Sequence, residues 1–206
     1  MQLRFECDLT GAEYVSQEAW RDANLVRCPL HPNGGCGFAR HGTYERISPP
    51  GTLIARWYCP QGHRTFSLLP DCLAARLSGT LAEVEAVVRD VEQATSLEAA
   101  CAGLRLDIEL PGALRWISRR VHAVHASLNV LKGLLPDLLA TCTPTLTAFC
   151  EHLGVARVLL GLRRIAAVFL HRLPAPLGFL PRRTAGDGDD GSLQHRAGAD
   201  PPPLPA

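Results

Sequence analysis

The sequence predicts an α+β fold that is mostly α: a small N-terminal β unit, a helical bundle and a disordered tail. Cysteine and histidine residues gather in two clusters on either side of a polar stretch whose pattern is typical of paired strands. From Leu69 onward the apolar period changes from two to 3.6, the period of helices. Beyond residue 180 no period remains. We therefore expect a β unit with an N-terminal arm over 1–69, helices over 70–180 and a tail over 181–206.

Composition limits the function classes. The chain has 206 residues and a net charge of +1, so any nucleic-acid-binding surface must be local. The opening MQLRFECDLTGAEY carries charges where a secretory leader has an apolar core, and the most apolar run, 153–170, contains three arginines. We therefore expect a cytoplasmic protein without a membrane span. In that reducing compartment the cysteines favour metal binding over disulfides.

The two clusters predict a structural zinc site. We expect the ligands to be Cys28, Cys36, Cys59 and His63, with His31 as the alternative to Cys36. Cys-Pro and Cys-Gly steps suit the tight turns that aim backbone N–H groups at a thiolate. A polar piece of about 40 residues also needs a metal or a disulfide to hold a fold. The alternative is a set of free cysteines and incidental histidines.

Before and between the clusters lie the predicted strands. LRFECDL alternates well enough for a short strand, and SQEAWRDAN could form one or two helical turns. ARHGTYERIS and GTLIARWYC predict a hairpin, with Ser-Pro-Pro-Gly as its turn. Arg56 and Arg64, interleaved with aromatic residues, could contact phosphates while the rings stack on bases. The alternative is that the aromatic residues pack over the metal.

The helical part begins with a short predicted helix from Asp71 to Leu77. Thr80 and Glu83 then form a capping box that starts a stronger helix, and Ser96 can cap the next one. Pro111 suits the first turn of a longer helix. A short helix, a loop and a longer arginine-rich helix in this order outline a helix-turn-helix.

In that longer helix, Arg115, Arg119 and Arg120 are the candidate DNA-binding residues. The acids of residues 80–110 are followed by a basic excess over 111–172, which favours a local DNA-facing side. The alternative is an ordinary bundle with solvated arginines. The segment VARVLLGLRRIAAVFLHRL predicts a final amphipathic helix, whose apolar face must be covered by this chain, a second copy or a partner.

The ordered set Cys-Pro, Cys-Gly, HGTYER, RWYCP and HRTFS resembles the N-terminal zinc ribbon of bacterial insertion-sequence transposases and their uncharacterised relatives. RTFSLLPDCL is the most specific piece, and SLEAACAGL with ALRWISRRV looks like the two DNA-contacting helices. The resemblance covers residues 28 to about 130. It implies a mobile-element protein that binds double-stranded DNA, with a transposase or a second copy as partner through the C-terminal helices. One departure is His63, which stands where the family has a final cysteine.

Such transposases cut DNA with an acidic triad on an RNase H-like domain, and no such pattern follows Pro111. We therefore expect a non-catalytic, zinc-binding DNA-binding protein related to the recognition part of a transposase, not an enzyme. The alternative is a zinc-stapled protein-interaction module without DNA binding.

Overall fold

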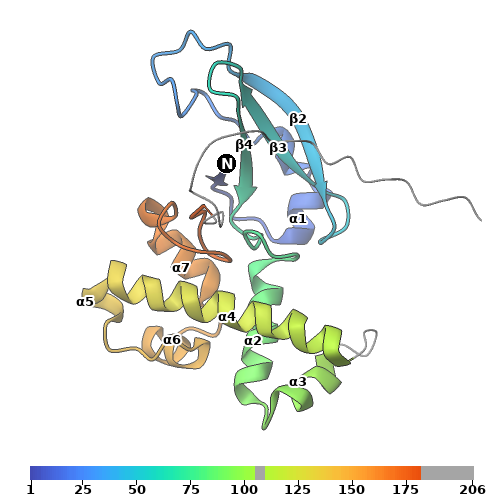
Figure 1. Ribbon diagram of the computed structural model, residues 1–206, viewed down its shortest axis with the longest axis vertical. Coiled ribbons are helices and arrows are strands. Elements are labelled where there is room, and N and C mark those ends of the chain that lie inside the picture. The colour runs from blue at the N-terminus through green and yellow to red at the C-terminus, as the bar shows by residue number, and fades with distance from the viewer. Residues whose placement is uncertain (105–109, 182–206) are drawn as a thin grey trace, which may run out of the picture.

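The computed structural model describes residues 1–104 and 110–181 as a mixed fold of strands and helices. In Figure 1 the sheet lies at one end of the molecule, with α1 beside it, and α2 to α7 lie at the other. The elements are β1 (Gln2–Phe5), α1 (Gly11–Ser16), η1 (Ala19–Arg21), β2 (Ala39–Arg46), β3 (Thr52–Cys59), β4 (Arg64–Pro70), α2 (Leu81–Gln93), α3 (Leu97–Leu104), α4 (Leu110–Leu134), α5 (Pro136–Leu139), α6 (Leu146–Leu153), α7 (Leu159–Ile165) and η2 (Ala167–Phe169).

The sheet has the strand order β1-β4-β3-β2. The predicted hairpin is confirmed, because β2 pairs antiparallel with β3, with an irregularity between Arg40 and Thr43. β4 extends the sheet antiparallel to β3, and β1 adds to β4 in parallel, from Gln2 opposite Ser67 to Phe5 opposite Pro70. The N-terminal strand therefore joins the strand that leads into the helices.

The predicted helix from Asp71 to Leu77 is wrong, because this segment consists of a turn, an isolated β-bridge of Leu73 with Thr80, and bends. Its carbonyl groups are not free for helical bonds: those of Asp71 and Leu73 accept hydrogen bonds from Arg163 at 2.9 and 2.6 Å. The Arg163 side chain is fully buried. A side chain from α7, ninety residues away in sequence, thus fixes the path by which the chain leaves the sheet.

The predicted caps of the next two helices are confirmed. Thr80 and Glu83 form the capping box at the start of α2, and the Ser96 hydroxyl accepts from the Ala99 N–H at 3.1 Å. α4 begins at Leu110, so Pro111 lies in its first turn as expected. α2 packs against both α3 and α4, and α3 packs against α4. The predicted loop between α3 and α4, like the predicted disordered tail, lies almost wholly outside the described residues.

The final predicted helix is shorter than expected. α7 ends at Ile165, and the short η2 follows it. The apolar side chains of the predicted helix, including Leu159, Leu162 and Leu170, are buried in the main core. The rest of the chain therefore covers much of its apolar face. In the part of the chain that the structure describes, no helix combines the length and the apolarity needed to cross a bilayer.

Candidate metal centre

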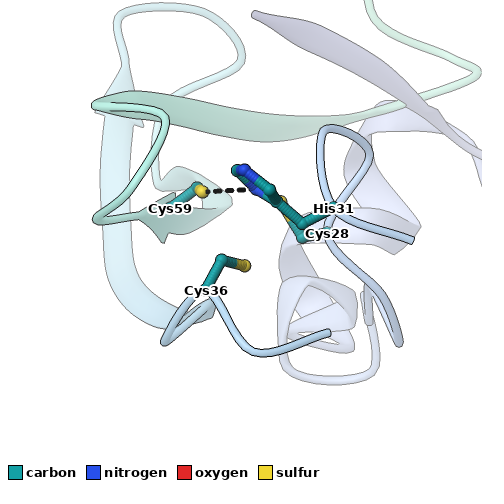
Figure 2. Close-up of side chains that lie close together, drawn as sticks. All are labelled: Cys28, His31, Cys36 and Cys59. Atoms are coloured by element: carbon teal, nitrogen blue, oxygen red, sulfur yellow. Dashed lines mark hydrogen bonds between the residues drawn. The ribbon is translucent and has the colours of Figure 1, made fainter. Parts of the chain in front are cut away.

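The structure brings together Cys28, His31, Cys36 and Cys59. One ligand atom from each lies within 4.8 Å of the others, and Figure 2 shows the four side chains gathered around one space. Cys28, His31 and Cys36 come from the loop between η1 and β2, and Cys59 is the last residue of β3. Residues that are 31 positions apart in sequence are therefore joined at one end of the sheet.

Local backbone geometry aims the ligands of the loop. The His31 N–H donates to the Cys28 carbonyl at 3.2 Å, which closes a tight turn and places both side chains on one side. Cys36 is followed by Gly37, whose φ of 65° lies in the region that favours glycine. The sequence Cys-Pro-Leu-His is thus a turn that presents two ligands at once.

The turn after β3 supplies the fourth ligand. The Gly62 N–H donates to the Cys59 sulfur at 3.3 Å, a bond that stabilises a thiolate. A Cβ at residue 62 would lie 2.5 Å from a terminal methyl group of Leu30, so a larger residue there would require the Leu30 side chain to move. The Gln61 side chain also donates to the Gly35 carbonyl at 3.3 Å. These contacts hold the two ligand-bearing loops together.

The ligand distances can be compared with those of a metal tetrahedron. With metal–sulfur bonds near 2.3 Å and metal–nitrogen bonds near 2.0–2.1 Å, a tetrahedral nitrogen–sulfur edge is about 3.6 Å. The His31 Nδ1 lies 3.6 Å from the Cys28 sulfur and 3.3 Å from the Cys59 sulfur. These residues could therefore hold a metal ion.

The surroundings shift the pKa values of the thiols in different directions. Burial raises the pKa of Cys28, but its hydrogen bonds with His31 and with backbone N–H groups outweigh that effect and lower the pKa to about 6. Burial raises the pKa of Cys59, and the hydrogen bond with Cys28 and the negative charge of Cys28 also raise it. Cys28 is thus the first of the two to become a thiolate, the form that binds metals.

The three cysteines belong to a small apolar cluster with Trp57, Phe66 and Leu68 on one face of the sheet. The Phe38 and Phe66 rings meet edge to face, with centroids 5.9 Å apart. The three sulfur-bearing side chains are therefore buried among apolar groups, while Cys28, His31 and Cys36 also line a cavity of about 540 Å³.

His63, predicted as a ligand, does not join this cluster, and His31 takes the place beside all three cysteines. His31 and Cys36 are therefore both candidate ligands, whereas the sequence offered His31 as an alternative to Cys36. The reason is strand alternation. Cys59 points to one face of the sheet and Tyr58 to the other. The His63 Nδ1 lies 3.4 Å from the Tyr58 hydroxyl, on the face away from the sulfur atoms. The Cys-x₂-His spacing of Cys28 and His31 was the signal that could have favoured His31.

The predicted DNA-binding residues of α4 have different environments. Arg115 and Arg119 are exposed. Arg120 is only 6 % exposed, its guanidinium donates to the Ser78 hydroxyl at 2.9 Å, and it lies 3.5 Å from the centre of the Trp116 ring. It therefore ties α4 to the chain segment before α2, and its geometry is that of a structural residue.

The sheet arginines also differ. Arg64 is exposed at the start of β4, whereas Arg56 is half-buried with its guanidinium 5.9 Å from the Tyr44 ring. Trp57 is buried under Arg40 in the cluster that contains the metal-site cysteines. For Trp57, packing near the metal site is therefore confirmed.

Comparison of this chain with protein-family models, curated proteins and solved structures gives no match. The functional argument consequently rests on the residues and contacts described above.

Proposed function

We propose that this protein is a non-catalytic DNA-binding protein whose β unit is held by one structural zinc ion. The observation that carries the proposal is the exposed basic stripe of α4. The stripe is formed by Arg115 and Arg119, which are both exposed and lie one turn apart, and the helix has no carboxylate between Leu110 and Leu134. An arginine-bearing helix without acids attracts the phosphates of a duplex and can enter its major groove.

Zinc is the ion that best suits the metal centre. Three thiolates and one imidazole form a soft donor set that matches a structural zinc site. All four tetrahedral positions would be filled by protein, which leaves none for a substrate or a reactive water. We therefore assign the ion a structural role and the protein no catalytic one.

Metal analysis of the purified chain tests this assignment. We expect one equivalent of zinc, which Cys59→Ser removes together with the fold of the sheet. Cys101→Ser is the matched control, because Cys101 is a buried cysteine in a separate apolar cluster. A protein that purifies without zinc and does not take it up would contradict the assignment.

The packing of α2, α3 and α4 supports a helix-turn-helix role. α3 and α4 contact each other, and α2 contacts both, as in the three-helix form of this motif. α4 would then be the recognition helix and Arg115 and Arg119 its duplex-facing residues. This role agrees with the resemblance to the DNA-recognition region of transposases.

Binding to random-sequence duplex DNA over a series of salt concentrations tests the DNA role. Replacing Arg115 and Arg119 together by alanine should weaken binding and reduce the salt slope by up to about two units, because two phosphate contacts are lost. Arg172→Ala is a control for the loss of one exposed positive charge outside α4. It removes an exposed arginine that lies beside Phe169, after the last short helix. No duplex binding at low salt would contradict the proposal.

The alternative is a zinc-stapled protein-interaction module. Ile165 and Val168 favour it, because these apolar side chains near the end of α7 are 49 and 72 % exposed. Sedimentation of the full chain would distinguish the two functions. A self-associating protein that has no affinity for duplex DNA would support the alternative.

A further inference from the structure

We propose that Cys7 and Cys72 form a peroxide-reactive dithiol that closes into a disulfide. The proposal does not rest on the DNA-binding function or on the metal centre. Both cysteines contact the main core, whereas the metal-site cysteines belong to the other apolar cluster of the sheet.

Strand register places the two residues opposite each other. β1 and β4 pair in parallel with a constant offset, from Gln2 opposite Ser67 to Phe5 opposite Pro70. The pairing continues one step further, because the Asp71 N–H donates to the Phe5 carbonyl at 3.2 Å. Continued past the strand ends at Phe5 and Pro70, the same offset sets Cys7 opposite Cys72. Neighbouring strands lie about 4.8 Å apart, and a disulfide spans Cα separations of about 4.4–6.8 Å. Two cysteines held at this strand spacing are close enough for an S–S bond.

The Cys7 sulfur has the surroundings of a reactive thiolate. It is partly buried, close to the Cys72 side chain and to the backbone N–H groups of Leu9 and Asp71. These donors lower the pKa of Cys7 to about 6, the Cys72 side chain contributing most. Cys7 is therefore largely a thiolate at neutral pH, and the thiolate is the form that attacks peroxides.

Cys72 has the complementary role of resolving thiol. Its hydrogen bond with Cys7 and its burial raise its pKa, so it keeps its proton while Cys7 is charged. It also lines a cavity of about 450 Å³ together with Asp8 and Leu9, which immediately follow Cys7. A small hydroperoxide in this cavity would lie next to Cys72 and to the two residues that follow Cys7.

The reaction needs only a hydroperoxide as oxidant. The Cys7 thiolate attacks one peroxide oxygen, the O–O bond breaks, and the other oxygen leaves and takes a proton to become water or an alcohol. The resulting Cys7 sulfenic acid reacts with the Cys72 sulfur. The S–S bond forms, and the hydroxyl group leaves with the Cys72 proton as water. Two thiols are thus oxidised while one peroxide is reduced.

The disulfide would fasten a junction between the two parts of the molecule. Asp71, beside Cys72, is held by Arg4 through two hydrogen bonds of 2.8 and 2.7 Å. The Cys72 carbonyl accepts from the Leu81 N–H, at the start of α2, at 2.7 Å. Oxidation would therefore lock β1 onto the segment that connects the sheet to the helices.

Peptide mapping of the zinc-loaded full chain tests the proposal. After hydrogen peroxide treatment, free thiols are alkylated in denaturant and the protein is digested without reductant. We expect one cross-linked peptide pair, Cys7 with Cys72, formed faster as the pH rises through about 6 in line with the Cys7 pKa. Cys142 should stay fully alkylated, and Cys142→Ser should leave the yield unchanged.

Variants separate the two roles. Cys72→Ala should leave Cys7 as a sulfenic acid that a dimedone-type probe labels, and Cys7→Ser should abolish both the cross-link and the labelling. Circular dichroism checks that each variant folds. Should Cys72→Ala not fold, the yield and pH dependence of the wild-type cross-link decide. A Cys7 that remains fully alkylated in the wild type at peroxide levels that oxidise Cys142 would overturn the proposal.

Discussion

At the scale of single residues, sheet alternation decides which histidine belongs to the metal centre. His63 follows Cys59 closely in sequence, yet it contacts Tyr58 on the other face of the sheet. His31 is farther from Cys59 in sequence, but its Nδ1 lies 3.3 Å from the Cys59 sulfur. Ligand types could be predicted from the sequence. The choice between two histidines depended on strand direction, which spacing alone does not give.

This difference yields a direct test. His31→Ala should lower zinc affinity by more than the 10–100-fold that loss of a residue hydrogen-bonded to a ligand typically costs. His63→Ala should leave the affinity unchanged, because its ring lies on the far face. Competition with a chromogenic chelator measures both variants. Equal losses in the two variants would show that the assignment of His31 is wrong.

Arg163 is the most deeply buried charged residue among those described, with a fully buried side chain. It donates to backbone carbonyls of two separate segments, at Asp71 after β4 and at Leu177 near the end of the described chain, both at 2.9 Å. Burial lowers its pKa to about 10, so it stays charged at neutral pH. Arg163→Met should destabilise the fold by about 3 kcal/mol or more, because several buried carbonyls lose their donors. Urea unfolding measures the loss, with the exposed Arg172→Met as control.

At the scale of elements, two of the acidic residues of α2, Glu85 and Glu92, cap other helices. Glu85 accepts from the N–H groups of Val158 and Leu159 at the start of α7. Glu92 accepts from those of Leu146 and Thr147 at the start of α6. The sequence suggested that the negative charge of this segment contrasts with a DNA-facing side. In the structure, the carboxylates of Glu85 and Glu92 stabilise the N-termini of α7 and α6.

Glu92 makes this cap depend on pH. Its burial raises its pKa, but bonds from Thr147, His125 and Leu146 outweigh burial, so the pKa lies below the ordinary value of 4.5. The stabilisation is therefore present above pH 4.5 and is lost as the pH falls through the lower folded-state value. Glu92→Gln should cost about 1–2 kcal/mol at neutral pH, as loss of a helix cap does. Unfolding curves at several pH values should show this difference shrinking in acid, and a constant difference would contradict the cap.

Local signals were predictable from the sequence and distant pairings were not. The capping box of Thr80 and Glu83 and the β2–β3 hairpin depend on residues close in sequence, and both are confirmed. An equivalent box at Thr10 and Glu13, which begins α1, carried the same signal and was missed. The parallel pairing of β1 with β4 and the turns after Pro70 depend on partners far along the chain, such as Arg163, and no local pattern reveals them.

At the scale of the whole molecule, two apolar clusters share one sheet. The metal-site cysteines lie in the smaller cluster, and the helices pack on the larger one. Phe5 packs against both clusters, and the chain beyond β4 is tied to the helical part through Arg163 and through the bond from the Leu81 N–H to the Cys72 carbonyl. Disruption of the smaller cluster should therefore also lower the thermal stability of the helices.

Removal of the metal tests this coupling. Free zinc at a hundred times its dissociation constant stabilises a folded protein by about 2.7 kcal/mol. In a chain of this length that corresponds to a melting shift of about 5–10 °C. We expect chelation to lower the midpoint by at least this amount in two signals together. One is the fluorescence of tryptophan, including Trp57, which is buried near the metal site, and the other is the helical circular dichroism.

Coincident shifts would follow from the shared junction at Asp71 and Cys72. If the fluorescence changed while the helices melted at their original temperature, the sheet and the helices would be independent units, and the buried Arg163 would serve only to anchor the chain beyond β4.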